Sequence, residues 1–411
     1  MPRFLASTAL SLFLVSFAVP AVAPETSEEI GIGDIVVTAQ KRAENIQDVP
    51  LAISAVGSEY LDSRGITSID RLGSIAPNMK IERAPSNKTI SQISIRGSVT
   101  INPAVTWEPA VGLYLDGVYI AKAQGSIFDV ADLERVEVLR GPQGTLYGRN
   151  ALAGAVNLIT KKPTGELGGN FELSYGNFNA WRGKAVLNLP AMGPLSVKLS
   201  GQIVKRDGFI KIGPNPFPAA FLARPNSVDR TNDLDGKTGM VQVRFAPEGN
   251  FSADYPFDYS RYNQRPDYAQ LVRVLPNNPF TALNSNPRLD RARAYGPALT
   301  MAYDFGSATL KSITAYRNLK WGDRIDLDGS PLDVAETERD TRFHSFSQEL
   351  QLTGTAADDR LNYVVGAFYY NETAETLGPQ RFFGFLNQVN APGAADLQSD
   401  YGSRTRAWAA Y

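Results

Sequence analysis

Residue types that build many functional sites are scarce in this sequence. It has no cysteine and only one histidine, His344, among 411 residues. Without cysteine there can be no disulfide and no thiolate metal site, and one imidazole cannot form a zinc site or supply a pair of haem ligands. We therefore interpret His344 as an ordinary strand or rim residue, and we expect no metal site and no cofactor.

Charge of either sign is not in excess. The 41 Lys and Arg residues nearly balance the 42 Asp and Glu residues, which leaves a net charge of −1. Nucleic-acid binding depends on a basic surface that neutralises phosphates, so we expect no nucleic-acid partner. The sequence also lacks a Gly-x-Ser-x-Gly elbow, a second histidine to act as a base and a cluster of metal ligands. We predict that the protein is not an enzyme.

Long apolar runs are absent after the N-terminus, where no segment approaches the ~18 residues of a membrane-spanning helix. The N-terminus itself has the order of a secretory signal peptide. Arg3 provides a positive charge, residues 4–19 are mostly apolar, and Ala21-Val22-Ala23 is a small-x-small cleavage site. We expect residues 1–23 to be a signal peptide, cleaved after Ala23 or after Ala21, and the protein to be exported.

From residue 166 onward, apolar and polar side chains alternate with a period of two. Phe171-Glu172-Leu173-Ser174-Tyr175 is one such run, and Gly, Pro, Asn or Asp bounds each of them. Short turns such as 190–194 alternate with long loops such as 213–236 and 374–403. A soluble β-sandwich would explain the alternation, but this loop asymmetry is typical of outer-membrane barrels. We predict that residues 166–411 are antiparallel transmembrane β-barrel strands, which satisfy the backbone in lipid without a helix.

Residues 45–165 do not follow that pattern and indicate a small α+β domain. Short β-rich runs, such as 111–120, occur between segments of helical character at 57–64 and 68–75. The apolar residues of this region suffice for one modest core.

The strand-rich region is too short to close around that domain. Strands ~4.8 Å apart and tilted ~40° each take ~6 Å of circumference, so about ten strands close at a radius of ~10 Å. A domain of ~120 residues has a hard radius near ~17 Å. A barrel of roughly twenty or more strands is needed to hold it. Because the sequence stops at Tyr411 inside a strand-like run, we expect an incomplete barrel, either a fragment of a longer protein or a truncated gene product.

One long motif carries a resemblance to a known family. Residues 133–163 read LERVEVLRGPQGTLYGRNALAGAVNLITKKP, and residues 48–53, 95–97 and 112–119 add shorter pieces. These segments resemble the plug signature of TonB-dependent outer-membrane receptors, almost residue for residue in the long motif. The resemblance implies an α+β plug domain at 45–165 followed by the N-terminal part of a transmembrane β-barrel at 166–411.

The plug motif supplies most of the candidate site residues. They are Arg96, Gly97, Arg140, Gly141, Pro142, Gly144, Tyr147, Gly148, Asn150 and Gly154. The glycines suit tight turns and close backbone approach, and a phosphate-binding loop is disfavoured because no Gly-Lys-Ser/Thr follows. The resemblance implies that the two arginines pair with carboxylates of the barrel wall, and Glu349 is our candidate partner. Such a pair would cost ~3–5 kcal/mol to break if buried and ~0–1 kcal/mol if exposed.

A second motif lies in a polar tail, residues 24–44, before the plug. Asp34-Ile35-Val36-Val37-Thr38-Ala39-Gln40 resembles the TonB box. A short β-branched segment of this kind suits strand addition to the sheet edge of a partner. The alternative is that the segment is simply the first strand of the plug. Its position between polar flanking segments favours the box.

The resemblance implies energised uptake across the outer membrane of a Gram-negative bacterium, where the barrel contacts lipid. TonB, energised by ExbB and ExbD, would act on the box. A scarce ligand would bind where plug and barrel loops meet, at residues 85–88, 102–108 and 122–126 and at loops after 213. A ferric siderophore ranks first as the ligand, ahead of cobalamin, oligosaccharides and aromatic compounds. The alternative is a passive porin-like or adhesin-like barrel without energy coupling.

Overall fold

The computed structural model describes residues 36–84, 87–100, 104–127, 132–213, 229–265, 280–282, 289–330, 332–358 and 360–411. The predicted signal peptide lies outside these residues, as do Asp34 and Ile35 of the segment that resembles a TonB box. None of the helices within the described ranges is long and apolar enough to cross a membrane.

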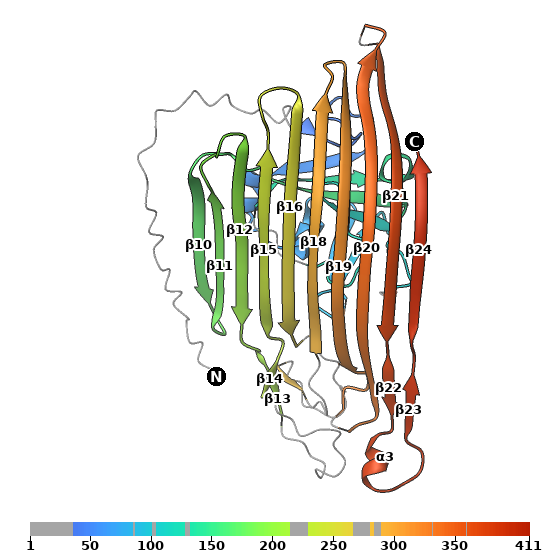
Figure 1. Ribbon diagram of the computed structural model, residues 1–411. Coiled ribbons are helices and arrows are strands. Elements are labelled where there is room, and N and C mark those ends of the chain that lie inside the picture. Colours follow the sequence, from blue (N-terminus) through green and yellow to red (C-terminus); the bar gives the residue numbers. More distant parts are fainter. Residues whose placement is uncertain are drawn as a thin grey trace.

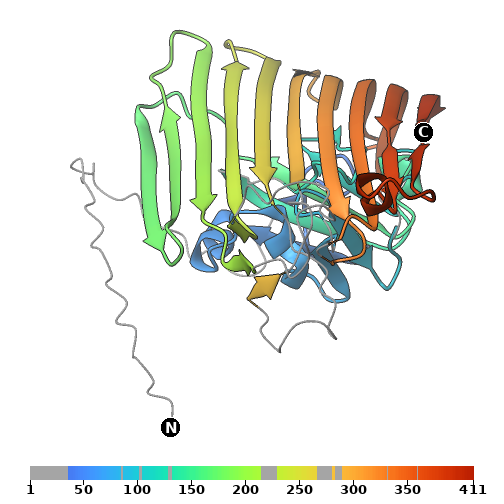
Figure 2. The same ribbon diagram turned by 90° about the horizontal axis from the view of Figure 1, so that it is seen from below.

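Long antiparallel strands form one wall, each hydrogen-bonded to the next (Figure 1). In spatial order they are β10 (Gly168–Gly176), β11 (Ala180–Asn188), β12 (Leu195–Arg206), β15 (Leu234–Phe245), β16 (Phe251–Gln264), β18 (Leu289–Asp304), β19 (Ala308–Asp326), β20 (Ala335–Ala356), β21 (Leu361–Leu377) and β24 (Tyr401–Ala410). Among the described residues, β10 and β24 do not pair with each other. The wall is therefore an open, curved sheet (Figure 2), which confirms the predicted antiparallel barrel strands.

Side chains alternate across this wall in the sense opposite to that of a soluble protein. On β12, Lys198 and Gln202 are 1% and 2% exposed, whereas Leu199 and Ile203 are 40% and 41% exposed. Lys198 contacts the N-terminal domain, because its Nζ donates to Asp132 Oδ2 at 2.7 Å. The polar face of the wall is thus the concave one, and the apolar face points outward, as expected for strands that face lipid.

The N-terminal domain contains a five-stranded mixed sheet. Its order is β3 (Ile53–Gly57), β8 (Leu133–Arg140), β9 (Gly154–Thr160), β6 (Val111–Leu115) and β7 (Val118–Tyr119), with only β6 and β9 parallel. A hairpin of β4 (Met79–Arg83) and β5 (Ser91–Ile95) contributes to the same core, which includes Leu72, Val136 and Val156. The helix α1 (Ser58–Ser63) and the 3-10 helix η1 (Ile69–Ser74) confirm the two predicted helical segments.

A second apolar cluster joins this domain to the wall. Tyr114 and Tyr119 of the domain pack with Trp321, Phe343 and Tyr370 of β19, β20 and β21. The rings of Tyr119 and Tyr370 lie 6.1 Å apart in an edge-to-face arrangement, which is favourable for aromatic pairs. The domain is therefore held against the concave face of the wall, as a plug would be (Figure 2).

The two ends of the wall differ in their connections. Residues 189–194, 246–250 and 305–307 are tight connections at one end, whereas 207–233 and 378–400 are long connections at the other (Figure 1). We name these the short-turn end and the long-loop end. The long-loop end carries a small sheet of β13 (Ile210–Ile212), β14 (Arg230–Thr231) and β17 (Thr281–Ala282), and the elements β22 (Pro379–Phe382), α3 (Phe385–Gln388) and β23 (Ala395–Gln398).

The prediction of an irregular loop over 374–403 was wrong. Strand β21 continues to Leu377, and β22 pairs with β23 within the supposed loop. Beyond the lipid, a strand does not need an apolar outward face. The run Asn371-Glu372-Thr373 is polar on both faces, so the sequence shows no alternation of apolar and polar residues although the strand continues. His344 lies on β20 and is exposed, as expected for an ordinary strand residue.

Candidate functional site

The segment that resembles a TonB box lies against the plug-like domain from Val36 onward. Strand β1 (Val36–Val37) pairs with β2 (Glu44–Asn45), so the chain forms a small hairpin before the domain begins. Val37 and Ala39 are fully buried, whereas Val36 is 49% exposed. The alternation of buried and exposed side chains fixes one face of the segment to the domain and leaves Val36 on the other.

Thr38 connects this segment to a buried carboxylate of β8. Its backbone amide donates to Glu137 Oε1 at 2.8 Å, and its hydroxyl donates to the same oxygen at 3.1 Å. Glu137 is fully buried and also accepts from Arg135 Nε at 2.8 Å and from Asn157 Nδ2 at 3.3 Å. A buried carboxylate is tolerated only with such partners. The hydrogen bonds to Thr38 are therefore strong contacts between the segment and the plug sheet.

Lys41 then joins the segment to the wall. Its Nζ lies 3.3 Å from Glu349 Oε1 on β20 and 4.9 Å from the centre of the Tyr147 ring. The Tyr411 hydroxyl donates to the same Glu349 oxygen at 2.6 Å. Burial, followed by the charge of Glu137, raises the pKa of the Tyr147 hydroxyl well above its usual value. Tyr147 therefore stays neutral, and its ring faces the ammonium group of Lys41.

Glu349 thus has a different partner from the one expected. Within the described residues, Arg96 and Arg140 form no ion pair, and Arg140 Nε is buried without a hydrogen-bond partner. Arg96 follows β5 in a left-handed turn with φ 54°, and its amide donates to Asn78 O at 2.9 Å. A Cβ on Gly141, where φ is 103°, would lie 3.3 Å from Arg96 Nη1. The Arg96 guanidinium therefore lies against the motif loop and not against Glu349.

The remaining motif residues build the turn between β8 and β9. Residues Gly144–Tyr147 form the short helix α2, which Gly148 follows directly and which the sequence analysis did not predict. A Cβ on Gly154 would lie 2.2 Å from Leu139 O, so only glycine fits between these paired strands. Asn150 Nδ2 donates to the Tyr119 hydroxyl at 2.5 Å. These contacts give the motif residues a structural role, with Pro142 in the loop just before α2.

A loop of the domain binds the wall near the long-loop end. The backbone amides of Lys88 and Thr89 both donate to Asp290 Oδ2, at 2.6 and 2.8 Å respectively. The Thr89 hydroxyl and Trp321 Nε1 donate to Asp290 Oδ1, at 2.6 and 3.1 Å. Asn87 Nδ2 reaches Asp323 Oδ2 at 2.9 Å. Asp290 at the start of β18 therefore fixes Lys88 and Thr89 to the wall. Lys88 belongs to the segment 85–88 that we predicted to contact a ligand, of which residues 85 and 86 lie outside the described residues.

A second loop, 122–126, binds the wall through an ion pair. Lys122 Nζ lies 3.0 Å from Glu372 Oε1 on β21, and both side chains are almost completely buried, with 4% and 3% exposed. Tyr370 and Thr405 also donate to Glu372, at 2.7 and 3.2 Å. The two loops are linked by the Ile90–Gln124 bridge. They form one polar contact surface between plug and wall.

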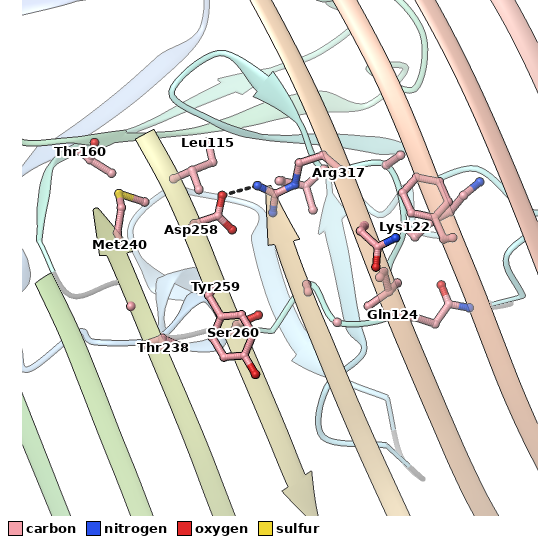
Figure 3. Close-up of a pocket in the computed structure, with 18 of the residues that line it drawn as sticks. Leu115, Lys122, Gln124, Thr160, Thr238, Met240, Asp258, Tyr259, Ser260 and Arg317 are labelled. Atoms are coloured by element: carbon pink, nitrogen blue, oxygen red, sulfur yellow. Dashed lines mark hydrogen bonds and ion pairs between the residues drawn. The ribbon is translucent and has the colours of Figure 1, made fainter. Parts of the chain in front are cut away.

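A cavity of ≈ 800 Å³, counted with its solvent-open space, lies between these contacts and the centre of the wall (Figure 3). Leu115, Lys122 and Thr160 line it from the domain, and the paired Asp258 and Arg317 line it from the wall. Because its two sides belong to different domains, a shift of the plug-like domain would change its shape directly. The described residues contain no group of three or more His, Cys, Asp or Glu side chains placed to hold a metal ion.

Comparisons with known proteins agree with this architecture. Residues 45–155 match the family described as TonB-dependent Receptor Plug Domain. Over 244 residues the chain is 30% identical to the pesticin receptor of Yersinia pestis. This alignment covers 58% of this chain and 33% of that protein. Over 214 residues it is 32% identical to the iron-regulated outer membrane virulence protein of Vibrio cholerae. This alignment covers 49% of this chain and 31% of that protein. The domain at residues 45–155 therefore belongs to the plug domains of TonB-dependent receptors.

Solved structures with the same fold are also receptors of this family. The ferric yersiniabactin uptake receptor FyuA of Yersinia pestis superposes with a TM-score of 0.60 at 20% identity, over 88% of this chain and 62% of that chain. The Pseudomonas aeruginosa receptor FpvA, in a complex with a heterologous pyoverdine, has a TM-score of 0.66 at 14% identity, over 91% of this chain and 51% of that chain. The chain therefore has the fold of these uptake receptors, a plug domain seated against an antiparallel barrel wall.

The chain spans about a third of the length of the two relatives named above, 33% and 31%. Several residues that join the N-terminal segment to the plug, or the plug to the wall, were not predicted. Glu137, Asp290 and Glu372 are buried carboxylates on strands, and each accepts hydrogen bonds from a segment distant in sequence. Glu137 was identifiable in principle, because it stands among apolar residues in the run Val136-Glu137-Val138 and a buried acid needs a partner. Asp290 and Glu372 carry no such signal.

Proposed function

We propose that this protein is an energised outer-membrane receptor that imports a scarce ligand. In this proposal residues 24–44 are a periplasmic tail, 45–165 are the plug, and 166–411 are barrel wall. TonB, energised by ExbB and ExbD, binds residues 34–40 by strand addition and pulls on the tail. No catalytic step is part of the proposal.

One observation carries this proposal. The hydrogen bonds from Thr38 to Glu137 join the candidate TonB-binding segment to the central part of the plug sheet. Force applied to residues before Thr38 would therefore act on β8 directly. The same movement would break the ion pair between Lys41 and Glu349 and so separate the segment from the wall. Val36, exposed on the other face, is available to a partner strand.

We propose a ferric siderophore as the ligand. The pesticin receptor and the iron-regulated protein are relatives whose names refer to a receptor and to iron, and FyuA is described as a ferric yersiniabactin uptake receptor. On the plug, Thr100, Trp107, Lys122 and Ser126 line a small pocket. Trp107 is 56% exposed there, and an exposed aromatic side chain suits contact with an aromatic chelate. The loops 87–89 and 122–126 would then transmit binding to the wall contacts.

The test is uptake by cells that carry the full-length gene as wild type, Val36→Pro or Val36→Thr. Proline removes a backbone donor needed for strand pairing, whereas threonine keeps the donor and the β-branched shape. Cells are given iron-labelled siderophores of the hydroxamate, catecholate and phenolate classes. We expect Val36→Pro to abolish accumulation of one of them while binding to the cell surface persists, and Val36→Thr to resemble wild type. Equal accumulation in all three strains would instead support a passive barrel.

A further inference from the structure

The outward face of the wall carries a row of basic residues in strict register. Directly opposite one another on β15, β16, β18, β19 and β20 lie Lys237, Arg261, Arg293, Lys320 and Arg342. All five side chains are exposed. The residues before and after them along the strands, such as Leu319 and Trp321, are buried in the contact with the plug. The five cations, which we name the basic row, therefore point away from the plug.

Among the residues that the structure describes, Glu375 on β21 is the one acid directly opposite a member of this row, and it faces Arg342 at the end of the row. Within the described residues, none of the five side chains makes an ion pair or a side-chain hydrogen bond. Outward cations nearer the long-loop end are different: Arg291 lies 3.7 Å from Asp340, and Arg324 lies 3.1 Å from Glu338. Like charges directly opposite on neighbouring strands repel each other. Four neighbouring cations with no acid directly opposite them therefore call for an anionic partner outside the chain.

The height of the basic row on the wall identifies the environment of that partner. Ten residues of β18 separate Arg293 from Tyr303, which lies beside the short-turn end. With ~3.3 Å per residue and a strand tilt of ~40°, this is ~25 Å along the barrel axis, the height of the apolar band of an outer-membrane barrel. Tyr259 and Tyr295, opposite each other in the next outward row, are placed as an aromatic girdle. A row that crosses strands tilted ~40° at right angles rises by ~12 Å over its ~19 Å length. The centre of the basic row, Arg261, Arg293 and Lys320, thus lies at the edge of the lipid on the side of the long loops, with Lys237 nearer the short-turn end and Arg342 nearer the long-loop end.

The long loops of such barrels face the cell exterior, so this edge is the headgroup level of the outer leaflet. We propose that the basic row binds the phosphate groups of a phosphorylated glycolipid in the outer leaflet. Arg and Lys are the side chains best suited to phosphate. With strands ~4.8 Å apart, five side chains extend over ~19 Å, which is long enough for two phosphate groups with at least two cations each. Glu375, opposite Arg342 on β21, ends the row.

The test is lipid binding by the purified full-length protein in a neutral detergent. The probes are lipid A with both phosphates and the same lipid after dephosphorylation, each measured by native mass spectrometry. The variant Arg261→Gln/Arg293→Gln/Lys320→Gln removes the centre of the basic row. The matched control, Arg291→Gln/Arg324→Gln, removes outward cations that already have carboxylate partners. We expect the triple variant to bind phosphorylated lipid A about 100-fold more weakly, the control to bind like wild type, and the dephosphorylated lipid to bind weakly to all.

Two results of the lipid measurements would overturn the proposal, and a competition with inorganic phosphate provides a third. One is equal affinity of wild type for the phosphorylated and dephosphorylated lipids, a comparison that stays decisive if the triple variant does not fold, as judged by heat-modifiable migration. The other is equal loss of affinity in the triple variant and the control. Inorganic phosphate distinguishes the sources of the anion: if millimolar phosphate displaces the lipid completely, the row is a phosphate site and the lipid proposal is wrong.

Discussion

The backbone amide of Thr38 donates a hydrogen bond of 2.8 Å to the buried carboxylate of Glu137, across 99 residues of sequence. Because the Thr38 hydroxyl donates to the same group, Glu137 holds the segment before the plug in place by two contacts. Hydrogen bonds to a charged acceptor contribute ~1.5–3 kcal/mol each. The segment that we assign to TonB is therefore anchored at its inner end and needs energy for its release.

Glu137→Gln should release this segment. The neutral amide of glutamine cannot accept hydrogen bonds from both Thr38 and Arg135 as the carboxylate does. The state in which the segment is bound to the plug should therefore lose ~1.5–3 kcal/mol. The sequence contains no cysteine, so Val37→Cys introduces a reporter at a fully buried position. We expect maleimide labelling of this cysteine to become roughly 10–100-fold faster in the Glu137→Gln background.

The matched control for this change is Glu134→Gln, on the same strand but with its side chain 46% exposed. Labelling should stay at the wild-type rate in that variant. If both variants label equally fast, Glu137 does not hold the segment, and the proposed path from the TonB-binding segment to β8 is wrong.

Asp290→Asn should loosen the plug loop at residues 87–89. The carboxylate accepts from two backbone amides on one oxygen and from Thr89 and Trp321 on the other. In asparagine one of these oxygens becomes an NH₂ group, which leaves buried donors unpaired at a cost of ~1–3 kcal/mol. Hydrogen–deuterium exchange of the loop amides should become faster by roughly 5–150-fold.

Asp304→Asn is the control on the same strand, because among the described residues this carboxylate accepts only from the Gly306 amide, in an exposed turn. Exchange at residues 87–89 should not change there. Unchanged exchange in Asp290→Asn as well would mean that other contacts, such as that between Asn87 and Asp323, suffice to hold the loop.

The general architecture was predictable because local patterns encode it. A strand that faces lipid on one side alternates apolar and polar residues, and the runs around Leu195 and Met240 lie on β12 and β15 as expected. The contacts between plug and wall were not predictable in the same way. Lys41 and Glu349 are 308 residues apart, and only the seating of the plug brings them to 3.3 Å.

The basic row shows the same limit of sequence patterns. Its members are separated by 24, 32, 27 and 22 residues in the sequence, since 261 − 237, 293 − 261, 320 − 293 and 342 − 320 give these values. The loops between the strands differ in length, so no fixed period marks the row. Only the strand register aligns the five side chains. Register depends on pairing between strands and is therefore not a property of any single run.

Breaking the buried ion pair between Lys122 and Glu372 should destabilise the receptor strongly. Each single change, Lys122→Met or Glu372→Gln, leaves a buried charge without its partner and should cost ~3–5 kcal/mol. The double variant should lose much less than the sum of the two, because neither charge remains. The apparent melting temperature of the full-length protein in detergent, measured for all four forms, gives the coupling between the two residues.

Lys80 and Glu82 supply the comparison for this cycle. They form a pair at 3.4 Å on β4 with side chains 76% and 64% exposed, so the same substitutions there should change stability by ~0–1 kcal/mol. Additive effects at Lys122 and Glu372 would show that the pair does not link the 122–126 loop to the wall.

Acid should weaken the plug partly through Asp70. Burial alone would raise the pKa of this carboxyl group, but the Arg83 guanidinium at 3.0 Å and the Ser68 hydroxyl hold its pKa below the usual value of 3.8. A group whose pKa is lowered by folding stabilises the protein above its unfolded pKa, and this stabilisation is lost as the pH falls through the folded value. The loss of stabilisation should therefore occur below about pH 4 and should amount to ~1 kcal/mol or less, as for a partly exposed pair.

Asp70→Asn should lower the melting temperature at pH 7, and wild type and variant should no longer differ near pH 2. Asp62→Asn, whose carboxyl group is 66% exposed and 3.7 Å from Lys184, should leave the pH profile unchanged. A profile for Asp70→Asn that runs parallel to wild type throughout this range would show that Asp70 and Arg83 do not contribute to the acid sensitivity of the plug.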